Sequence, residues 1–133
     1  MQTVYPAAES LTVEFKSDRS GYPDRELIEA LTCLANTAGG ELWLGVEDNG
    51  IASGLHRSHL NLSHLIALIA MQTRPSLVVK INKRRVNNVT VAQIIVPRAN
   101  ILIATQEGAY LQRRIKTDGT PECIHIEPVD LLN

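Results

Sequence analysis

The sequence predicts an α+β domain that combines a mixed β-sheet with two helices, and three observations lead to this prediction. Short apolar segments alternate with two longer segments of helical periodicity, in the order β-α-β-α-β-β plus one or two further strands. A right-handed crossover in the first β-α-β unit would make its two strands parallel, whereas a polar turn joins the next pair as a hairpin. The composition, with 44% hydrophobic and 20% charged residues among 133, suits one core and predicts a single domain over residues 1–133.

The first strand and the first helix are marked by a change of periodicity. Residues 11–15 alternate apolar and polar side chains, as a half-buried strand does. Asp24 is the expected N-cap of a helix. The apolar residues that follow it at helical spacing are Leu27, Leu31, Leu34, Ala35 and Ala38. Gly39 and Gly40 end this helix, and we expect one of them at positive φ.

The rest of the chain divides into shorter elements. Residues 42–46 are apolar without alternation, which is typical of a central strand covered on both faces. The polar residues 82–88 lie between two apolar segments and predict the turn of a hairpin. The later elements are expected to be a helix at 59–72, strands at 77–81, 89–96, 109–115 and 123–126, and the start of a helix at 129–133.

Three acidic residues are candidate metal ligands. Glu14 lies near the carboxyl end of the first strand and Asp48 just beyond that of the second, so parallel strands would bring both to one edge of the sheet. Converging carboxylates attract Mg²⁺ or Mn²⁺, and such an ion can activate water for hydrolysis. Glu9 is an odd number of residues before Glu14, so the chain must bend near Ser10 to bring it to the same site. The alternative is three solvated acids.

Basic residues gather in the second half of the chain. Residues 1–70 hold nine acids and four bases, whereas residues 71–133 hold nine bases and five acids. The bases that could hold nucleic-acid phosphates are Lys80, Lys83, Arg84 and Arg85 in the hairpin, and Arg113, Arg114 and Lys116 in the tail. Charges of this kind equally protect a sheet edge from aggregation.

Several classes of protein are excluded at this stage. No GxxxxGK[ST] motif occurs, so no P-loop nucleotide site is expected. No apolar run approaches the ~18 residues of a membrane-spanning helix, and the N-terminus lacks the regions of a signal peptide. Cys33 and Cys123 lie far apart without paired spacing, which favours reduced thiols in a cytoplasmic protein, with Cys33 in the core. The four histidines lack the spacing of a zinc site.

Residues 9–54 carry a set of motifs in a specific order: ExxxxEFK from Glu9, ANTxGG from residue 35, GVxD ending at Asp48, and a closing Gly54. In this order and with these gaps the chain resembles the Schlafen AlbA-type domain, also described as a divergent AlbA-like domain assigned to DNA binding. The resemblance implies an AlbA-like α+β fold. The residues that we assign to structural turns are Asn36, Thr37, Gly39, Gly40, Gly45, Gly50 and Gly54. The segment 113–117 departs from the family's tyrosine–arginine–glycine–serine–threonine run because it lacks the glycine.

The resemblance also implies candidate functions. In nuclease members of the Schlafen family, carboxylates that match Glu9, Glu14 and Asp48 bind a divalent metal and cut structured RNA. Lys16 shares a strand face with Glu14 and would meet the scissile phosphate. Prokaryotic relatives are classed as transcriptional regulators and often carry a winged-helix domain after this one, so we expect the N-terminal part of a longer regulator.

These implications lead to one prediction and two alternatives. The prediction is a cytoplasmic nucleic-acid-binding domain of a transcriptional regulator, with DNA or RNA as its partner and no membrane association. The first alternative is an endoribonuclease that depends on Mg²⁺ or Mn²⁺. The second is an interaction module that forms a homodimer, since twofold pairing is the commonest closed arrangement.

Overall fold

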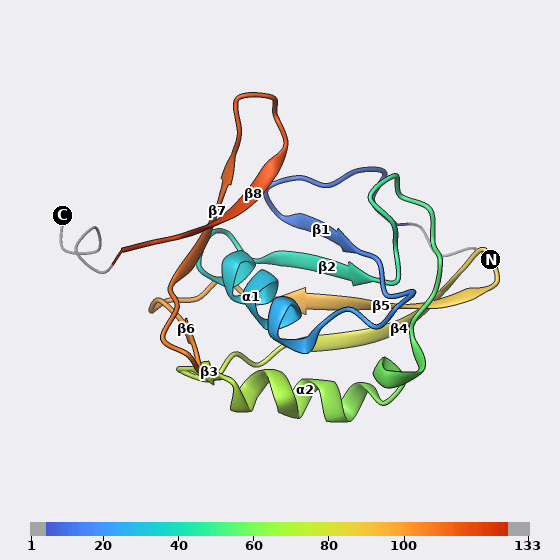
Figure 1. The fold of residues 1–133 in the computed structure, drawn as a ribbon, viewed down its shortest axis with the longest axis horizontal. Helices are drawn as coiled ribbons and strands as arrows, with labels where there is room; N and C mark the ends of the chain where they lie inside the picture. The colour runs from blue at the N-terminus through green and yellow to red at the C-terminus, as the bar shows by residue number, and fades with distance from the viewer. Residues whose placement is uncertain (1–4, 128–133) are drawn as a thin grey trace.

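A four-stranded mixed sheet forms the centre of the computed structural model, which describes residues 5–127 (Figure 1). Its strands, in spatial order, are β1 (Val13–Lys16), β2 (Gly40–Leu44), β5 (Val89–Val96) and β4 (Lys80–Val86). Two shorter pairs accompany it: β3 (Thr73–Arg74) with β6 (Ala104–Thr105), and β7 (Leu111–Ile115) with β8 (Pro121–His125). The helices are α1 (Asp24–Ala35), the single 3-10 turn η1 (Arg57–His59) and α2 (Leu62–Met71).

The strand pairing confirms the predicted mixed sheet. Strand β1 runs parallel to β2, with Phe15 opposite Trp43, and α1 makes the crossover between them. Strand β5 is antiparallel to both β2 and β4. The fold is therefore α+β, with a β-α-β unit followed by a helix and a hairpin, as the sequence predicts.

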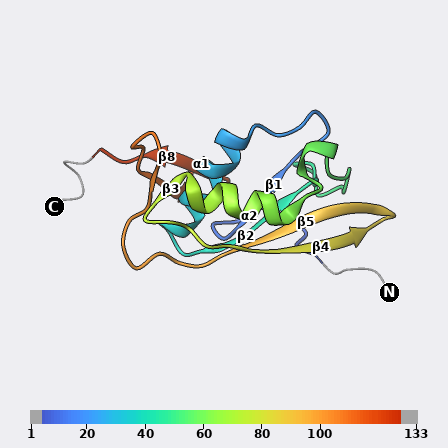
Figure 2. The same cartoon turned by 90° about the horizontal axis from the view of Figure 1, so that it is seen from below.

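Both helices cover the same face of the sheet (Figure 2). Helix α1 is amphipathic, and its side chains Leu27, Leu31 and Leu34 are fully buried. They join one core with side chains of α2 and of the sheet, among them Leu42, Leu44, Leu65, Ile69, Ala92, Ile94 and Val96. The unbroken apolar run of β2 follows from this position, because a second, smaller core lies on its other face.

The face without helices carries that smaller core and a chain of polar contacts. Trp43 is 1% exposed there, and its indole Nε1 donates to Glu41 Oε1 at 2.9 Å. Gln93 Nε2 donates to Glu41 Oε2 at 3.0 Å, and Arg84 Nε donates to Gln93 Oε1 at 3.0 Å. We call these four residues the Trp43–Arg84 network. It links the central strand to a basic side chain of the outermost strand β4.

The β4–β5 hairpin is confirmed, but its expected turn is too long. Strand β4 begins at Lys80 and continues to Val86, so only Asn87 and Asn88 form the turn. Both have positive φ, at 48° and 67°, as a two-residue turn of type I′ requires. Residues 82–85 are polar because β4 is an edge strand, and polar side chains hide the strand from an analysis of hydrophobic pattern.

Other boundaries also need correction. Helix α1 starts at Asp24 itself and has Pro23 at its N-cap, with no side-chain cap bond, so the expected N-cap role of Asp24 is wrong. Helix α2 is shorter than the predicted 59–72 because η1 and a short link precede it. The pair β3–β6 was not predicted, since two-residue strands leave no periodicity. The expected helix at 129–133 lies outside the described residues.

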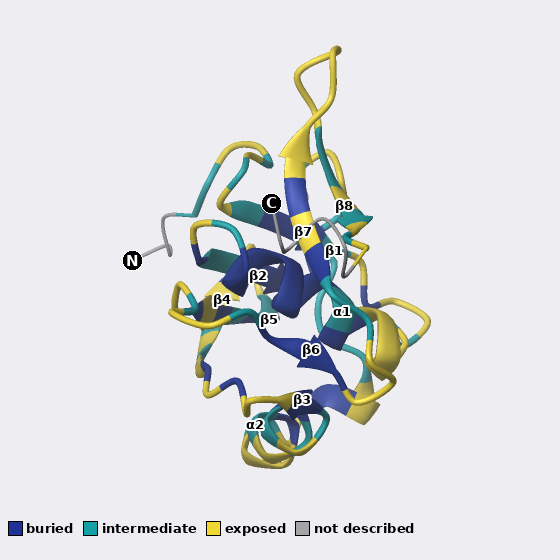
Figure 3. Cartoon of the chain, turned by 90° about the vertical axis from the view of Figure 1, so that its left-hand side faces the viewer, coloured by how far each residue is buried: buried dark blue, intermediate teal, exposed yellow. Residues whose placement is uncertain are grey.

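The cysteines differ most from expectation. Cys33 in α1 and Cys123 in β8 form a disulfide across a separation of 90 residues, so the prediction of reduced thiols is wrong. Cys33 is fully buried, as predicted, whereas Cys123 is exposed. The disulfide forms because tertiary packing brings the β7–β8 hairpin into contact with α1. The tip of this hairpin projects from the body and is exposed (Figure 3). Sequence spacing carries no sign of that contact.

None of the helices within residues 5–127 is long and apolar enough to cross a membrane.

Candidate nucleic-acid interface and acidic site

A tight turn brings Glu9 to Glu14. Ser10 and Val13 exchange backbone hydrogen bonds, Ser10 N–H to Val13 at 3.0 Å and Val13 N–H to Ser10 at 3.3 Å. This is the bend near Ser10 that the odd spacing demands. The Glu9 carboxylate then accepts a hydrogen bond from the backbone N–H of Phe15 at 3.0 Å. The turn therefore brings Glu9 close enough to Glu14 for each carboxyl to affect the pKa of the other.

Their proximity shifts the two pKa values in opposite directions. Burial, followed by the hydrogen bond with Glu14, raises the pKa of Glu9 from 4.5 to about 7, and the charge of Asp48 adds to this rise. Burial also acts to raise the pKa of Glu14, but hydrogen bonds from Glu9 and Arg113 and the charge of Lys16 outweigh it and lower that pKa. Glu9 is thus the partner that keeps its proton to the higher pH, with a pKa of about 7, and Glu14 is the partner that ionises first.

We expect the pH dependence of stability to reveal Glu9. A carboxyl whose pKa is higher in the folded protein binds its proton more tightly when folded, so stability falls as pH rises from 4.5 towards about 7. Glu9→Gln, which resembles the protonated carboxyl, should flatten the decline in melting temperature across this window. An unchanged decline in the variant would assign it to other groups.

Glu14 is also held by two cations of the protein itself. Its Oε1 lies 3.2 Å from Lys16 Nζ, and its Oε2 accepts from Arg113 Nη1. Lys16 is placed as predicted, on the same face of β1 as Glu14, and its ammonium also lies 5.6 Å from the centre of the Tyr22 ring. The Glu14 charge raises the pKa of Lys16 although burial acts to lower it.

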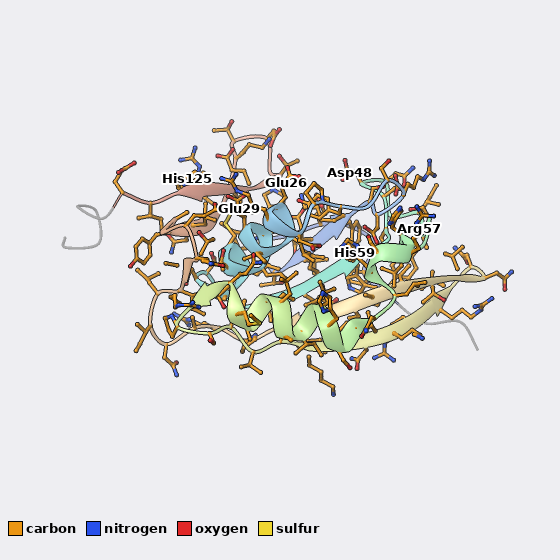
Figure 4. All side chains as sticks on the ribbon, turned by 60° about the horizontal axis from the view of Figure 1, so that its bottom comes forward. Glu26, Glu29, Asp48, Arg57, His59 and His125 are labelled. Atoms are coloured by element: carbon orange, nitrogen blue, oxygen red, sulfur yellow. A yellow bond between two sulfur atoms is a disulfide. The ribbon has the colours of Figure 1, made fainter. Side chains whose placement is uncertain are left out.

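The contacts of Glu9, Glu14 and Asp48 bear on the predicted metal site. Among residues 5–127, no group of three or more His, Cys, Asp or Glu side chains is arranged to hold a metal ion. Glu14 is paired with Lys16 and Arg113, and the pKa of Glu9 is raised to about 7, so this carboxyl is only partly ionised near neutral pH. Asp48 is exposed in the loop after β2 (Figure 4). In this arrangement Glu14 is engaged by cations of the protein itself, and the Mg²⁺ or Mn²⁺ site stays a prediction.

Arg113 points inward, unlike the other predicted phosphate-binding residues. Its side chain is 2% exposed and holds the turn before β1. The guanidinium donates to the backbone carbonyls of Ser10 at 2.6 Å, Leu11 at 2.9 Å and Val13 at 3.3 Å, in addition to Glu14. Every contact described for it is internal, so we exclude Arg113 from the candidate phosphate-binding surface.

The β4–β5 hairpin carries the other main group of bases. Lys80, Lys83 and Arg85 are exposed, and Arg84 is half-buried through its bond to Gln93. None of these four side chains forms an ion pair with an acid in the part of the chain that the structure describes. The hairpin is therefore a two-stranded ribbon with a net positive charge.

The β7–β8 hairpin is more nearly neutral. Arg114 Nε lies 2.5 Å from Glu122 Oε1, and the charge of Lys116 acts on the nearby Asp118. This hairpin and the turn of the β4–β5 hairpin lie at different ends of the molecule (Figure 1). The structure therefore does not bring the two predicted basic groups together.

The turn between α1 and β2 connects distant parts of the chain. Asn36 is buried, and its amide nitrogen donates to the carbonyls of Ile103 at 2.8 Å and Leu111 at 2.9 Å. Thr37 Oγ1 accepts from the N–H of Arg113 at 2.8 Å. Gly39 and Gly40 have φ of 71° and 140°, which confirms the predicted positive φ. The remaining predicted turn residues, Gly45, Gly50 and Gly54, all have positive φ in the loop that follows β2.

The chain is similar to known proteins over most of its length. A family model described as Schlafen, AlbA_2 matches residues 9–120. The chain belongs to the Schlafen AlbA_2 family. None of the curated proteins matches it.

Two solved structures resemble this Schlafen AlbA_2 domain. The DIP2311 protein of Corynebacterium diphtheriae has a TM-score of 0.70 and 23% identity, over 90% of this chain and 23% of that one. The N-terminal domain of a RecG-related protein from Nitrosomonas europaea has a TM-score of 0.54 and 24% identity, over 69% of this chain and 66% of that one. These likenesses establish the fold, and the chain spans under a quarter of the Corynebacterium protein.

One buried charged cluster of this Schlafen AlbA_2 domain leaves no signal in the sequence. His59 is 4% exposed, with Nδ1 2.8 Å from Asp18 Oδ1 and Nε2 2.8 Å from Asp24 Oδ1. Asp18 is fully buried and also accepts from the backbone N–H groups of Tyr22 and His56. These contacts join the loop before α1, the first turn of α1 and η1. No motif marks them, because Asp18 and His59 are 41 residues apart.

We expect the His59 cluster to make stability depend on pH. Burial acts to lower the pKa of His59, but hydrogen bonds with Asp24 and Asp18 outweigh it and raise the pKa above 6.5. Its contribution is therefore complete below pH 6.5 and is lost as pH rises through the higher pKa of the folded state. Thermal melts from acid to alkaline pH should show a smaller alkaline decline in His59→Gln. Parallel curves for the two proteins would contradict this assignment.

Proposed function

We propose that this Schlafen AlbA_2 domain binds nucleic acid through its β4–β5 hairpin, as the nucleic-acid-binding part of a transcriptional regulator. The observation that carries the proposal is the group of four bases without an acidic partner on one ribbon, among the described residues. A row of phosphates would supply the missing negative charge, and displaced counterions would drive the association. The fold likeness to the N-terminal domain of a RecG-related protein is consistent with a nucleic-acid partner.

The arrangement of β4 favours this surface over the tail. Lys83 and Arg85 are exposed on one face of the hairpin, and Lys80 and Arg84 lie on the other face. The bond from Gln93 fixes Arg84 in place, so less side-chain entropy is lost when it meets a phosphate. Arg114 is already paired with Glu122, and any phosphate contact there must compete with that pair.

Replacing Lys83, Arg84 and Arg85 together by Ala should weaken binding of all sequences alike. Each lost phosphate contact makes the slope of log affinity against log salt shallower by about 0.9 on duplex DNA. The slope of the triple variant should therefore be shallower by up to about three. At low salt we expect affinity to fall at least about tenfold. Fluorescence anisotropy with labelled duplex DNA and labelled structured RNA, over a series of salt concentrations, measures both quantities.

The matched control is the double variant Arg114→Ala, Lys116→Ala, which removes bases from the β7–β8 hairpin. It should change affinity much less than the triple variant does. Equal losses in the two variants would point to nonspecific attraction, and unchanged affinity in the triple variant would refute a role for the β4–β5 hairpin.

The same samples test the ribonuclease alternative. Because Lys16 and Arg113 hold Glu14, we expect structured RNA to stay intact with and without Mn²⁺. Cleavage that requires Mn²⁺, stops with chelator and disappears in Glu14→Gln would instead favour the ribonuclease.

Dimerisation, the other alternative, finds little support in the edge strand β4. Its exposed lysines and arginines repel a second copy of the same edge. Light scattering at high concentration measures whether a homodimer forms through another surface.

A further inference from the structure

The geometry points to a modification site at Cys123, where a small zwitterionic thiol exchanges with the Cys33–Cys123 disulfide from the cavity between α1 and β8. This site is separate from the β4–β5 hairpin. A thiol of this class carries an ammonium and a carboxylate group beside its sulfur, as free cysteine does.

A cavity of about 200 Å³ gives access to only one of the two sulfur-bearing residues. Its walls come from β1, the loop before α1, α1 itself, β7 and β8, and Cys123 is among the residues that line it. Cys123 is exposed, whereas Cys33 is fully buried on the other side of the bond. Since exchange depends on access of the attacking thiolate to sulfur, attack is directed to Cys123.

The charges that line the cavity are mixed. Glu26 and Glu29 are three positions apart on α1 and so share one side of the helix. Lys16 and His125 line the same cavity from β1 and β8, and Figure 4 shows His125 near the two acids. Neither Glu26 nor Glu29 forms an ion pair within residues 5–127. The cavity thus offers two carboxylates to an ammonium group and the imidazole of His125 to a carboxylate, while Lys16 beside them is already paired with Glu14.

The non-polar part of the cavity limits the size of the ligand. Ala30 and Leu111 supply apolar surface beside the sulfur, which suits the single methylene of an amino-acid thiol. A volume of about 200 Å³ holds a molecule of that size. The cavity therefore combines an accessible disulfide sulfur with contacts for a small zwitterionic thiol.

The exchange itself needs no other reactant. The thiolate of the incoming thiol forms a bond to Cys123 Sγ, the Cys33–Cys123 bond breaks, and its electron pair leaves with Cys33 Sγ. The proton that the incoming thiol released is matched by the proton that Cys33 takes up. One disulfide is consumed and one is formed, and no electrons are gained or lost overall.

The exchange would release β8 from α1 without releasing β7. Beyond the disulfide, β8 is held chiefly by its pairing with β7. Strand β7 has its own anchors, since Asn36 binds the carbonyl of Leu111 and Arg113 holds the turn before β1. Backbone amides of β8 should therefore lose protection from hydrogen exchange in the modified protein, while those of β7 keep it.

The test compares four thiols on the full chain: cysteine, cysteamine without the carboxylate, mercaptopropionate without the ammonium, and mercaptoethanol with neither. Intact-mass spectrometry follows the mixed disulfide, and peptide mapping locates it. With rates divided by the thiolate concentration of each reagent, cysteine should react at least about fivefold faster than mercaptoethanol. The mixed disulfide should map to Cys123.

The double variant Glu26→Gln, Glu29→Gln should reduce the rate with cysteine to that with mercaptopropionate and leave the rate with mercaptoethanol unchanged. Glu107→Gln, an acid outside the cavity, is the matched control. If the double variant melts at a lower temperature, Glu26→Gln alone replaces it, because that side chain is exposed. Equal normalised rates for the four thiols, modification at Cys33, or no exchange at all would each overturn the proposal.

Discussion

Gly40→Ala is expected to abolish folding under ordinary conditions. A Cβ atom at this position would lie 2.1 Å from the backbone carbonyl oxygen of Thr12, and φ is 140°, a conformation that L residues rarely adopt. The obstacle is the backbone that leads into β1, so no side-chain rotation relieves it. The loss should exceed about 4 kcal/mol, a large share of the stability of a domain of this size. Circular dichroism melting of the purified variant measures it, and Gly40→Val should be at least as damaging.

Gly119→Ala is the matched control for this effect. Gly119 also has positive φ, at 87°, but a Cβ there meets no atom within 4 Å. Backbone strain alone should then lower stability by about 1–2 kcal/mol. A Gly40→Ala melt as mild as that of Gly119→Ala would show that β1 can move away from the α1–β2 turn.

Arg113→Met should destabilise the protein by about 3–5 kcal/mol, because it leaves Glu14 as a buried carboxylate without its main partner. It also removes the donors that satisfy three carbonyls of the turn before β1. Lys16 remains near Glu14, but its single contact at 3.2 Å does not replace the lost guanidinium bonds. Chemical denaturation followed by tryptophan fluorescence gives the free energy of unfolding.

The adjacent residue provides the control. Arg114 is exposed, and its ion pair with Glu122 lies at the surface, so Arg114→Met should change stability by no more than about 1 kcal/mol. Adding Glu14→Gln to Arg113→Met removes the stranded charge and should recover part of the loss. A double variant no more stable than Arg113→Met would mean that the turn carbonyls, and not Glu14, account for the effect.

Much of the fold was predictable because it depends on local patterns. The α1 stripe, the apolar run of β2 and the glycines after α1 specify the β-α-β unit. Strand β4 was misplaced because its residues 82–85 are polar and lie at a sheet edge, where hydrophobic alternation is absent. The disulfide was missed because only the packing of β8 near α1 brings Cys123 to Cys33.

In the candidate site too, features set by local patterns could be predicted and features set by tertiary packing could not. The shared face of Glu14 and Lys16 follows from strand periodicity, and the odd spacing to Glu9 correctly demands a bend. The inward orientation of the Arg113 side chain could not be predicted, since its partner Glu14 is 99 residues away in the sequence. Residues that interact over such separations leave no periodic signal, and only the assembled fold reveals them.

The Trp43–Arg84 network allows intrinsic tryptophan fluorescence to report on the β4–β5 hairpin. Trp43 is the single tryptophan of the chain, so all indole emission comes from one buried ring beside the central strand. Its N–H contacts Glu41, which Gln93 connects to Arg84 on the outermost strand. A phosphate bound to Arg84 would add a negative charge at the end of this network and alter the field around the indole. Occupancy of the hairpin could therefore be followed as a shift in emission, without a label on either partner.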